Sequence, residues 1–186
     1  MRILRELITD DDVVVLGIGS PNVDWAALGT RALDFGIYAA MGLAQSFGLG
    51  IALAQPQRRV LVLEGDGGVL MSLGAIASSA EQAPPNLKHF IFTNRSFGAT
   101  GNQPLPNARR LDFVAAARAL GAHSTSATTL DEFRTVAESV LQQPGYVVVS
   151  VETDQGQLRD FIPGEMRTPL PLEQRARFLR AIGLET

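Results

Sequence analysis

Short apolar runs that alternate with longer helical patterns are the feature that most constrains the fold of this 186-residue chain. The runs at residues 13–17, 59–63, 88–93 and 146–151 are rich in β-branched and other apolar residues, and residues 122–126 form a further short candidate strand. Strands that are apolar on both faces are typical of parallel sheets covered by helices on each side. We therefore predict an α/β protein of three layers, with a doubly wound, mostly parallel sheet and helices on both faces.

Helical patterns fill the intervals at residues 40–54, 69–81, 112–120, 130–142 and 172–182. The helix at 112–120 opens on Asp112, a residue type that caps helix N-termini. Residues 152–171 are polar and contain prolines, which predicts an irregular arm. Length and pattern together predict one domain over residues 1–186, in which residues 152–186 form a C-terminal arm and a short helix.

Residues 35–57 carry no charged side chain, a length that would suffice for a membrane span. Small residues recur in it every four positions, at Gly36, Ala40, Ala44, Gly48 and Ala52. In an α/β protein such a stripe lets a buried helix lie close to a sheet, and the alternation around it favours this interpretation over a membrane helix. Residues 1–12 are charged and lack the apolar segment of a signal peptide, so we expect a cytoplasmic protein without membrane contact.

The composition excludes several kinds of function. The chain has no cysteine, which excludes a disulfide framework, a thiolate zinc site, an iron–sulfur cluster held by this chain and a cysteine nucleophile. Sixteen basic and nineteen acidic side chains give a net charge of −3, so the chain has no basic footprint for nucleic acid.

A glycine-rich loop, Glu64-Gly65-Asp66-Gly67-Gly68, follows the strand at 59–63. Ligands of open parallel sheets bind beyond the carboxyl ends of the strands. Gly67 and Gly68 would let backbone N–H groups approach a ligand, and the start of the next helix favours a phosphate. Asp66 would repel that phosphate unless a divalent cation lay between them, so the loop predicts a phosphate and a metal together. A tight strand–helix turn with Asp66 as cap is the structural alternative.

Asn94 ends the strand at 88–93, 28 residues after Asp66 and with one predicted helix between them. If the two strands are neighbours in the sheet, both side chains emerge side by side. A carboxylate, an amide oxygen and a loop carbonyl form a hard oxygen site that suits Mg²⁺. Asn94 alone is more often a turn residue, so the pair and its spacing carry the prediction.

These residues resemble the diphosphate-binding motif of thiamine-diphosphate enzymes, in which GDG is followed by a helix and by an apolar strand that ends in Asn. Upstream, residues 39–42 (AAMG) resemble the family's segment beneath the thiazolium ring. Downstream, residues 97–103 (FGATGNQ) resemble a loop of sulfopyruvate and phosphonopyruvate decarboxylases. The resemblance covers roughly residues 12–182. It implies the thiamine-diphosphate-binding fold, thiamine diphosphate and Mg²⁺ as cofactors, and decarboxylation of a small 2-oxo acid.

The resemblance assigns roles to the matching residues around the metal. Asp66, the side chain of Asn94 and the backbone carbonyl of Ser96 would bind Mg²⁺. Gly67 and Gly68 would hold the diphosphate through their N–H groups. The remaining cofactor contacts implied on this side are Gly65, Phe97 and Gly98.

Two further roles concern the reactive end of the cofactor. Met41 would be the wedge that bends the cofactor, and the carbonyl of Ala39 would accept a hydrogen bond from the 4′-amino group. Ala39 stands where the family usually has Gly. Arg95 and Asn102 also depart from the family pattern, and these departures bear on the substrate side of the loop.

The resemblance also implies a missing part. In this family a glutamate on a separate pyrimidine-binding domain protonates the aminopyrimidine ring, and this chain resembles only the diphosphate-binding unit. Glu64 is a poor substitute because it precedes the metal loop. We therefore predict a heteromer with a separately encoded pyrimidine-binding alpha subunit, two of each chain, with part of the helix at 40–54 in the interface.

Three alternative functions remain. One is a carboligase of the acetolactate synthase type, and a second is the beta subunit of a 2-oxo acid:ferredoxin oxidoreductase, which the absence of cysteine disfavours. The third is a non-catalytic binding or assembly subunit, which the retained Asp66, Gly67, Asn94 and Met41 disfavour.

Other polar and aromatic residues have weaker indications. The loop at 17–34 is long enough to suspect function. Its Asp24 and Trp25 either line the mouth of the cleft or pack in the core. His89 and His123 each begin a predicted strand, and we interpret both as structural because nothing places them near a reacting atom.

Overall fold

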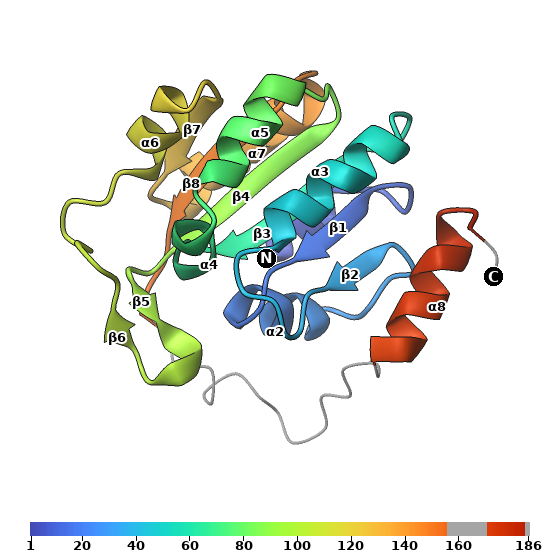
Figure 1. Cartoon of the computed structure of the whole chain (residues 1–186), viewed down its shortest axis with the longest axis horizontal. Coiled ribbons are helices and arrows are strands. Elements are labelled where there is room, and N and C mark those ends of the chain that lie inside the picture. Colours follow the sequence, from blue (N-terminus) through green and yellow to red (C-terminus); the bar gives the residue numbers. More distant parts are fainter. Residues whose placement is uncertain (156–170, 185–186) are drawn as a thin grey trace.

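A six-stranded sheet forms the centre of the structure, a computed structural model that describes residues 1–155 and 171–184 (Figure 1). The order of strands is β2-β1-β3-β4-β8-β7, and every neighbouring pair is parallel. The strands are β1 (Val13–Leu16), β2 (Asp34–Gly36), β3 (Val60–Gly65), β4 (Leu87–Thr93), β7 (His123–Ala127) and β8 (Val147–Glu152). The predicted α/β fold with a doubly wound, mostly parallel sheet is therefore confirmed.

Helices cover both faces of this sheet (Figure 1). They are α1 (Arg2–Leu7), α2 (Ser20–Ala26), α3 (Ala44–Ala54), α4 (Asp66–Met71), α5 (Gly74–Gln82), α6 (Phe113–Ala119), α7 (Leu130–Gln142) and α8 (Pro171–Ala181). Because successive strand residues point to opposite faces, Val60 and Val62 pack with α3, α5, α6 and α8, whereas Leu61 and Leu63 pack with α1, α2 and α7. The chain thus has the three predicted layers.

The connections diverge at the middle of the sheet. β1 leads through α2 to β2 at one edge, whereas its neighbour β3 leads through α4 and α5 to β4 on the other side. Loops that leave adjacent carboxyl ends in opposite directions open a crevice between them. This crevice is where the functional site is expected.

The predicted helix at 40–54 begins only at Ala44. Gly42 causes the delay because its φ of +83° turns the chain in a conformation that L side chains rarely adopt. Within the helix, the stripe of small residues has the predicted role. A Cβ atom placed on Gly48 would lie 2.3 Å from Cγ2 of Val62, so α3 lies directly against β3.

The predicted helix at 69–81 is in fact two helices. α4 begins at Asp66, so Asp66, Gly67 and Gly68 form its first turn and do not precede it as a loop, while Gly65 ends β3 and caps the helix. Ser72 then adopts φ −133° and ψ 41°, outside the helical range, and α5 begins at Gly74.

Several short elements are absent from the prediction. These are α1, α2, β2 and the antiparallel pair of β5 (Ser96–Phe97) and β6 (Gln103–Pro104), which encloses a 3₁₀ turn at Gly98–Thr100. They are too short for a hydrophobic period to reveal them. The longer α7 spans the predicted residues 130–142, and the Asp112 side chain caps α6 by accepting the Ala115 N–H at 2.9 Å.

Helix α8 covers the outer edge of β2. The Gln174 amide donates to the Gly36 carbonyl at 2.9 Å and accepts the Gly36 N–H at 3.0 Å, as a neighbouring strand would. The predicted arm is shorter than 152–171, because Glu152 ends β8 and Pro171 begins α8, and residues 156–170 lie outside the described residues. No helix in the described part of the chain has the length and hydrophobicity needed to cross a membrane.

Candidate functional site

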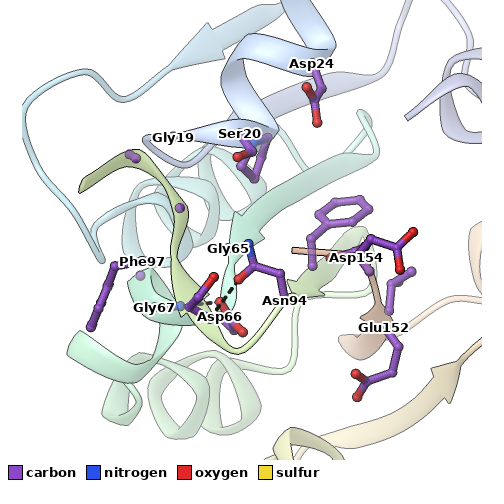
Figure 2. A pocket seen from close by; sticks show the side chains of 18 of the residues that line it. Gly19, Ser20, Asp24, Gly65, Asp66, Gly67, Asn94, Phe97, Glu152 and Asp154 are labelled. Carbon is purple, nitrogen blue, oxygen red and sulfur yellow. Dashed lines mark hydrogen bonds between the residues drawn. The ribbon is translucent and has the colours of Figure 1, made fainter. Parts of the chain in front are cut away.

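A pocket of about 660 Å³ lies at the carboxyl ends of β1, β3, β4, β7 and β8 (Figure 2). It occupies the crevice that the diverging connections open. Every predicted site residue except Ala39 lines it: Met41, Gly65, Asp66, Gly67, Gly68, Asn94, Ser96, Phe97 and Gly98. The two loops meet because β3 and β4 are neighbours, with Gly65 paired with Phe92 at the ends of the strands.

Asp66 lies at the junction of β3 and α4 and is only 2% exposed. Its Oδ2 accepts the Arg95 N–H at 2.6 Å, and its Oδ1 accepts the Gly67 N–H at 2.8 Å. Burial raises the pKa of Asp66, whereas N–H donors from Arg95, Gly67 and Asn94 counteract part of that increase. A buried carboxylate held by backbone donors is suited to bind a cation in a fixed position.

Asn94 and Ser96 form a turn directly after β4. The Asn94 side-chain oxygen accepts the Ser96 N–H at 3.0 Å, and Arg95 between them has a φ of +62°. Figure 2 shows the side chain of Asn94 beside that of Asp66. A carboxylate, an amide and the backbone of this turn thus form a set of oxygen atoms of the kind that Mg²⁺ prefers.

The wall opposite this turn consists of the backbone of Gly67 and Gly68. A Cβ atom on Gly67 would lie 2.8 Å from Cε1 of Phe97 and 3.2 Å from Cε of Met41, so Gly67 is confined between those side chains. A Cβ atom on Gly68 would lie 2.8 Å from Oε1 of Glu64. A side chain at either position would force its neighbours to shift, and with glycine at both the turn presents main chain to the pocket.

Met41 and Ala39 are placed differently from each other. Met41 is half-buried and lines the pocket beside Gly67. Ala39 is exposed and does not contribute to the pocket wall. Its predicted role requires only its carbonyl oxygen and stays a prediction.

Additional residues line the pocket that were not predicted as site residues. Gly19 and Ser20, after β1, lie on one side, and a Cβ atom on Gly19 would lie 4.0 Å from Cβ of Ala99 across the pocket. Others follow β7 and β8: Thr128, Thr129, Leu130, Glu152, Thr153 and Asp154. Only their place in the sequence could have indicated these residues, because they lie at or after the carboxyl ends of strands.

The charged side chains that line the described pocket are all carboxylates: Asp24, Asp66, Glu152 and Asp154. Burial raises the pKa of Asp24. Asp24 lines the pocket, whereas its neighbour Trp25 is 1% exposed and packs in the core. Each of the two alternatives considered for this pair therefore holds for one residue. The carboxylates of the pocket disfavour an anionic ligand, and a cation between the ligand and Asp66 would remove that repulsion.

Glu64 and His89 form a buried pair outside the pocket wall. Glu64 Oε2 lies 3.7 Å from Nε2 of His89, and the side chains are 3% and 0% exposed. Burial raises the pKa of Glu64 to about 7, although an N–H from Gln45 counteracts part of that shift, and burial lowers the pKa of His89 to about 3. His123 begins β7, is exposed and also does not line the pocket.

Comparisons with known proteins give a consistent relationship. Residues 17–151 match the family "Thiamine pyrophosphate enzyme, C-terminal TPP binding domain". The sulfopyruvate decarboxylase subunit beta of Methanothermobacter thermautotrophicus is 37% identical over 114 residues, which are 61% of this chain and 60% of that one. The subunit beta of Methanococcus maripaludis is 28% identical over 98% of this chain and 95% of its own length. The phosphonopyruvate decarboxylase of Streptomyces viridochromogenes is 34% identical over 95% of this chain and 44% of its own length.

A solved structure has the same fold. The thiamine diphosphate-dependent 4-hydroxybenzoylformate decarboxylase of Rhodococcus jostii superposes with a TM-score of 0.71 and 25% identity, over 82% of this chain and 31% of that one. The alignment thus covers about a third of that enzyme. The family match and the names of these relatives support the assignment of the chain to a thiamine-diphosphate-dependent decarboxylase. The chain belongs to the thiamine pyrophosphate enzymes, and it corresponds to their C-terminal, cofactor-binding domain.

Proposed function

We propose that this chain is the diphosphate-binding subunit of a heteromeric, thiamine-diphosphate-dependent decarboxylase that acts on a small 2-oxo acid. The observation that carries the proposal is the pocket in which Asp66, Asn94 and the glycine turn meet. Sulfopyruvate- or phosphonopyruvate-like acids are the preferred substrates because those names belong to the relatives. Residues 1–186 would form one cofactor-binding domain in the cytoplasm, with residues 152–186 as a C-terminal extension beyond the family match.

Asp66, the side chain of Asn94 and the Ser96 carbonyl would hold Mg²⁺. The donor set fits, because Asp66 is buried, is fixed by two backbone N–H groups and lies beside Asn94. Mg²⁺ would then separate the diphosphate from the carboxylates of the pocket. Gly65, Gly67, Gly68, Phe97 and Gly98 would surround the diphosphate.

Thiamine diphosphate, when bound, supplies a carbon nucleophile and an electron sink for the loss of CO₂. The chain's own residues bind and orient it. Met41, which packs beside Gly67, would support the bent cofactor, and the Ala39 carbonyl would accept a hydrogen bond from the 4′-amino group. Phe97 closes the other side of Gly67 and would exclude water there.

The activating glutamate would come from a pyrimidine-binding alpha subunit. Glu64 does not line the pocket and is confined beneath Gly68, so it does not reach a ligand in this pocket. Three relatives are named beta subunits, which supports a separate partner. Helix α3 carries no charge. Its exposed residues Ser46, Gly50, Leu53 and Ala54, with Leu43 before it, would contribute to the interface with the alpha subunit in a complex of two copies of each chain.

The test uses the chain purified together with the product of a neighbouring gene that encodes a similar-sized chain with a glutamate at a strand end. CO₂ release is followed with Mg²⁺, thiamine diphosphate and a panel of 2-oxo acids. Asp66→Ala should abolish activity and Mg²⁺-dependent cofactor binding, while Asp131→Asn, at an exposed residue of α7, should change neither. Full activity of Asp66→Ala would refute the site. Carboligation products would indicate the acetolactate synthase type, and a complex without cofactor binding would indicate a non-catalytic subunit.

A further inference from the structure

Arg95 stands between the two proposed metal ligands that follow β4. It is one of the few residues other than glycine with a left-handed backbone, at φ +62°. Its N–H donates to Oδ2 of Asp66 at 2.6 Å, and its carbonyl accepts the Leu105 N–H at 3.0 Å. The backbone of Arg95 therefore connects the third proposed ligand, Asp66, to the turn that carries the other two.

The side chain of Arg95 connects this turn to two further segments. Its Nη1 donates to the carbonyls of Ala108 at 2.8 Å and Leu111 at 3.3 Å. Its Nη2 donates to Oε1 of Glu152 at 2.7 Å, at the carboxyl end of β8. One guanidinium thus joins the segment at 105–111 and strand β8 to the turn at 94–96.

We propose that Arg95 is a positioning residue that fixes the metal-binding turn. The planar guanidinium carries its donors on separate nitrogens in fixed directions, so Nη1 reaches the carbonyls of Ala108 and Leu111 while Nη2 reaches Glu152. A lysine has three donors on a single nitrogen and cannot reproduce this fork. These contacts hold a backbone conformation that an arginine would otherwise rarely adopt. The salt bridge also neutralises Glu152, a pocket carboxylate that would repel the diphosphate. This role rests on the proposed function, although the structural part is independent of it.

Hydrogen exchange of the full chain tests the structural part without any ligand or partner. Arg95→Gly removes the side chain and tolerates the left-handed backbone. We expect the amides of residue 95, Ser96 and Leu105 to exchange about tenfold faster, as loss of hydrogen bonds from a charged group predicts. Asn107→Gly is the matched control, because Asn107 has a φ of +58° in the same loop and an exposed side chain. It should leave those rates unchanged.

Slower or unchanged exchange in Arg95→Gly would overturn the proposal, since it would mean that the side chain does not hold the turn. If Arg95→Gly does not fold, Arg95→Lys and Glu152→Gln are measured at the same amides. Both should accelerate exchange, by less than tenfold, and unchanged rates in both would equally overturn it.

Binding of Mn²⁺ by the complex with its partner, in the presence of thiamine diphosphate, tests the functional part. Mn²⁺ substitutes for Mg²⁺ as a spectroscopic probe. We expect Arg95→Gly to bind Mn²⁺ about tenfold more weakly than the parent and Arg95→Lys to recover part of that affinity. The melting temperature of each variant, followed through the signal of the β-sheet, should equal that of the parent. Equal Mn²⁺ affinity in all three proteins would refute the positioning role. If the parent complex does not bind Mn²⁺ with thiamine diphosphate, the proposed function and this metal-positioning role fail together, while hydrogen exchange still decides the structural part.

Discussion

The buried pair of Glu64 and His89 should give the chain two opposing pH dependences of stability, which cancel between pH 4.5 and 6.5 and which single variants separate. Burial raises the pKa of Glu64 from 4.5 to about 7 and lowers that of His89 from 6.5 to about 3. Between about pH 3 and pH 7 the folded pair therefore holds one proton, whichever residue carries it. The unfolded pair holds two protons below pH 4.5, one between 4.5 and 6.5, and none above 6.5.

Stability changes with pH by about 1.4 kcal/mol per unit for each proton by which the two states differ. His89 alone has a lowered pKa when folded, so its contribution is lost as pH falls below 6.5. Glu64 alone has a raised pKa when folded, so its contribution is lost as pH rises above 4.5. Between pH 4.5 and 6.5 the two contributions oppose each other, and the pair adds no slope.

Single substitutions separate the two contributions. In His89→Leu only Glu64 remains, and the free energy of unfolding should fall by about 3 kcal/mol, relative to the parent, as pH rises from 4.5 to about 7. In Glu64→Gln only His89 remains, and the free energy of unfolding should fall by about 3 kcal/mol as pH decreases from 6.5 to 4.5.

Urea unfolding at a series of pH values, without Mg²⁺ or cofactor, measures these slopes. The double variant His89→Leu, Glu64→Gln is the control, and its profile should run parallel to that of the parent between pH 4.5 and 6.5. Two single variants with slopes of the same sign, or with profiles parallel to the parent, would refute the assignment of opposite pKa shifts to this pair.

Two packing predictions concern helices that cover the sheet. Gly48→Ala should destabilise the chain by about 1–3 kcal/mol, because its Cβ would collide with Val62. Gly50→Ala on the same helix is the control, because its Cβ would meet no atom within 4 Å, and it should be neutral or stabilising. Thermal unfolding of both variants measures the difference. Gln174→Ala should cost about 2 kcal/mol in urea unfolding, because it leaves both backbone groups of buried Gly36 without their partner, and a change below about 0.5 kcal/mol would contradict that.

The sequence predicts the part of the fold that periodicity records. Long elements such as the helix at 130–142 were predicted well because a buried face of 3.6-residue period extends over several turns. The break at Ser72 and the late start at Ala44 escaped prediction, because both depend on local backbone angles and not on hydrophobic pattern. The edge strand β2 escaped because it has only three residues and is completed by Gln174 from the far end of the chain.

The candidate site was predictable where residues of distinctive chemistry follow strands that are neighbours in the sheet. Asp66 and Asn94 each directly follow a strand, and the expectation that these strands are neighbours brought the two residues together. Gly19 and Ser20 have no charge and a less distinctive pattern, so only the topology reveals them. The contact of Glu64 with His89 required the register of β3 and β4, which pairs Glu64 with Ile91 and leaves His89 two residues away on the same face.

The chemistry of the pocket wall bears on how the proposed reaction would be divided between this chain and its proposed partner. The pocket combines a buried carboxylate, an amide and main-chain surfaces at Gly67 and Gly68, and the other charged side chains lining it are carboxylates too. Such a wall can hold a metal ion and, through it, a diphosphate, but its carboxylates without a salt bridge among the described residues disfavour the carboxylate of a 2-oxo acid. In the proposed complex, the groups that attract the acid substrate and that activate the cofactor would come from the partner subunit. We accordingly expect substrate specificity to follow the partner subunit when partners are exchanged between related complexes, while Mg²⁺ affinity follows this chain.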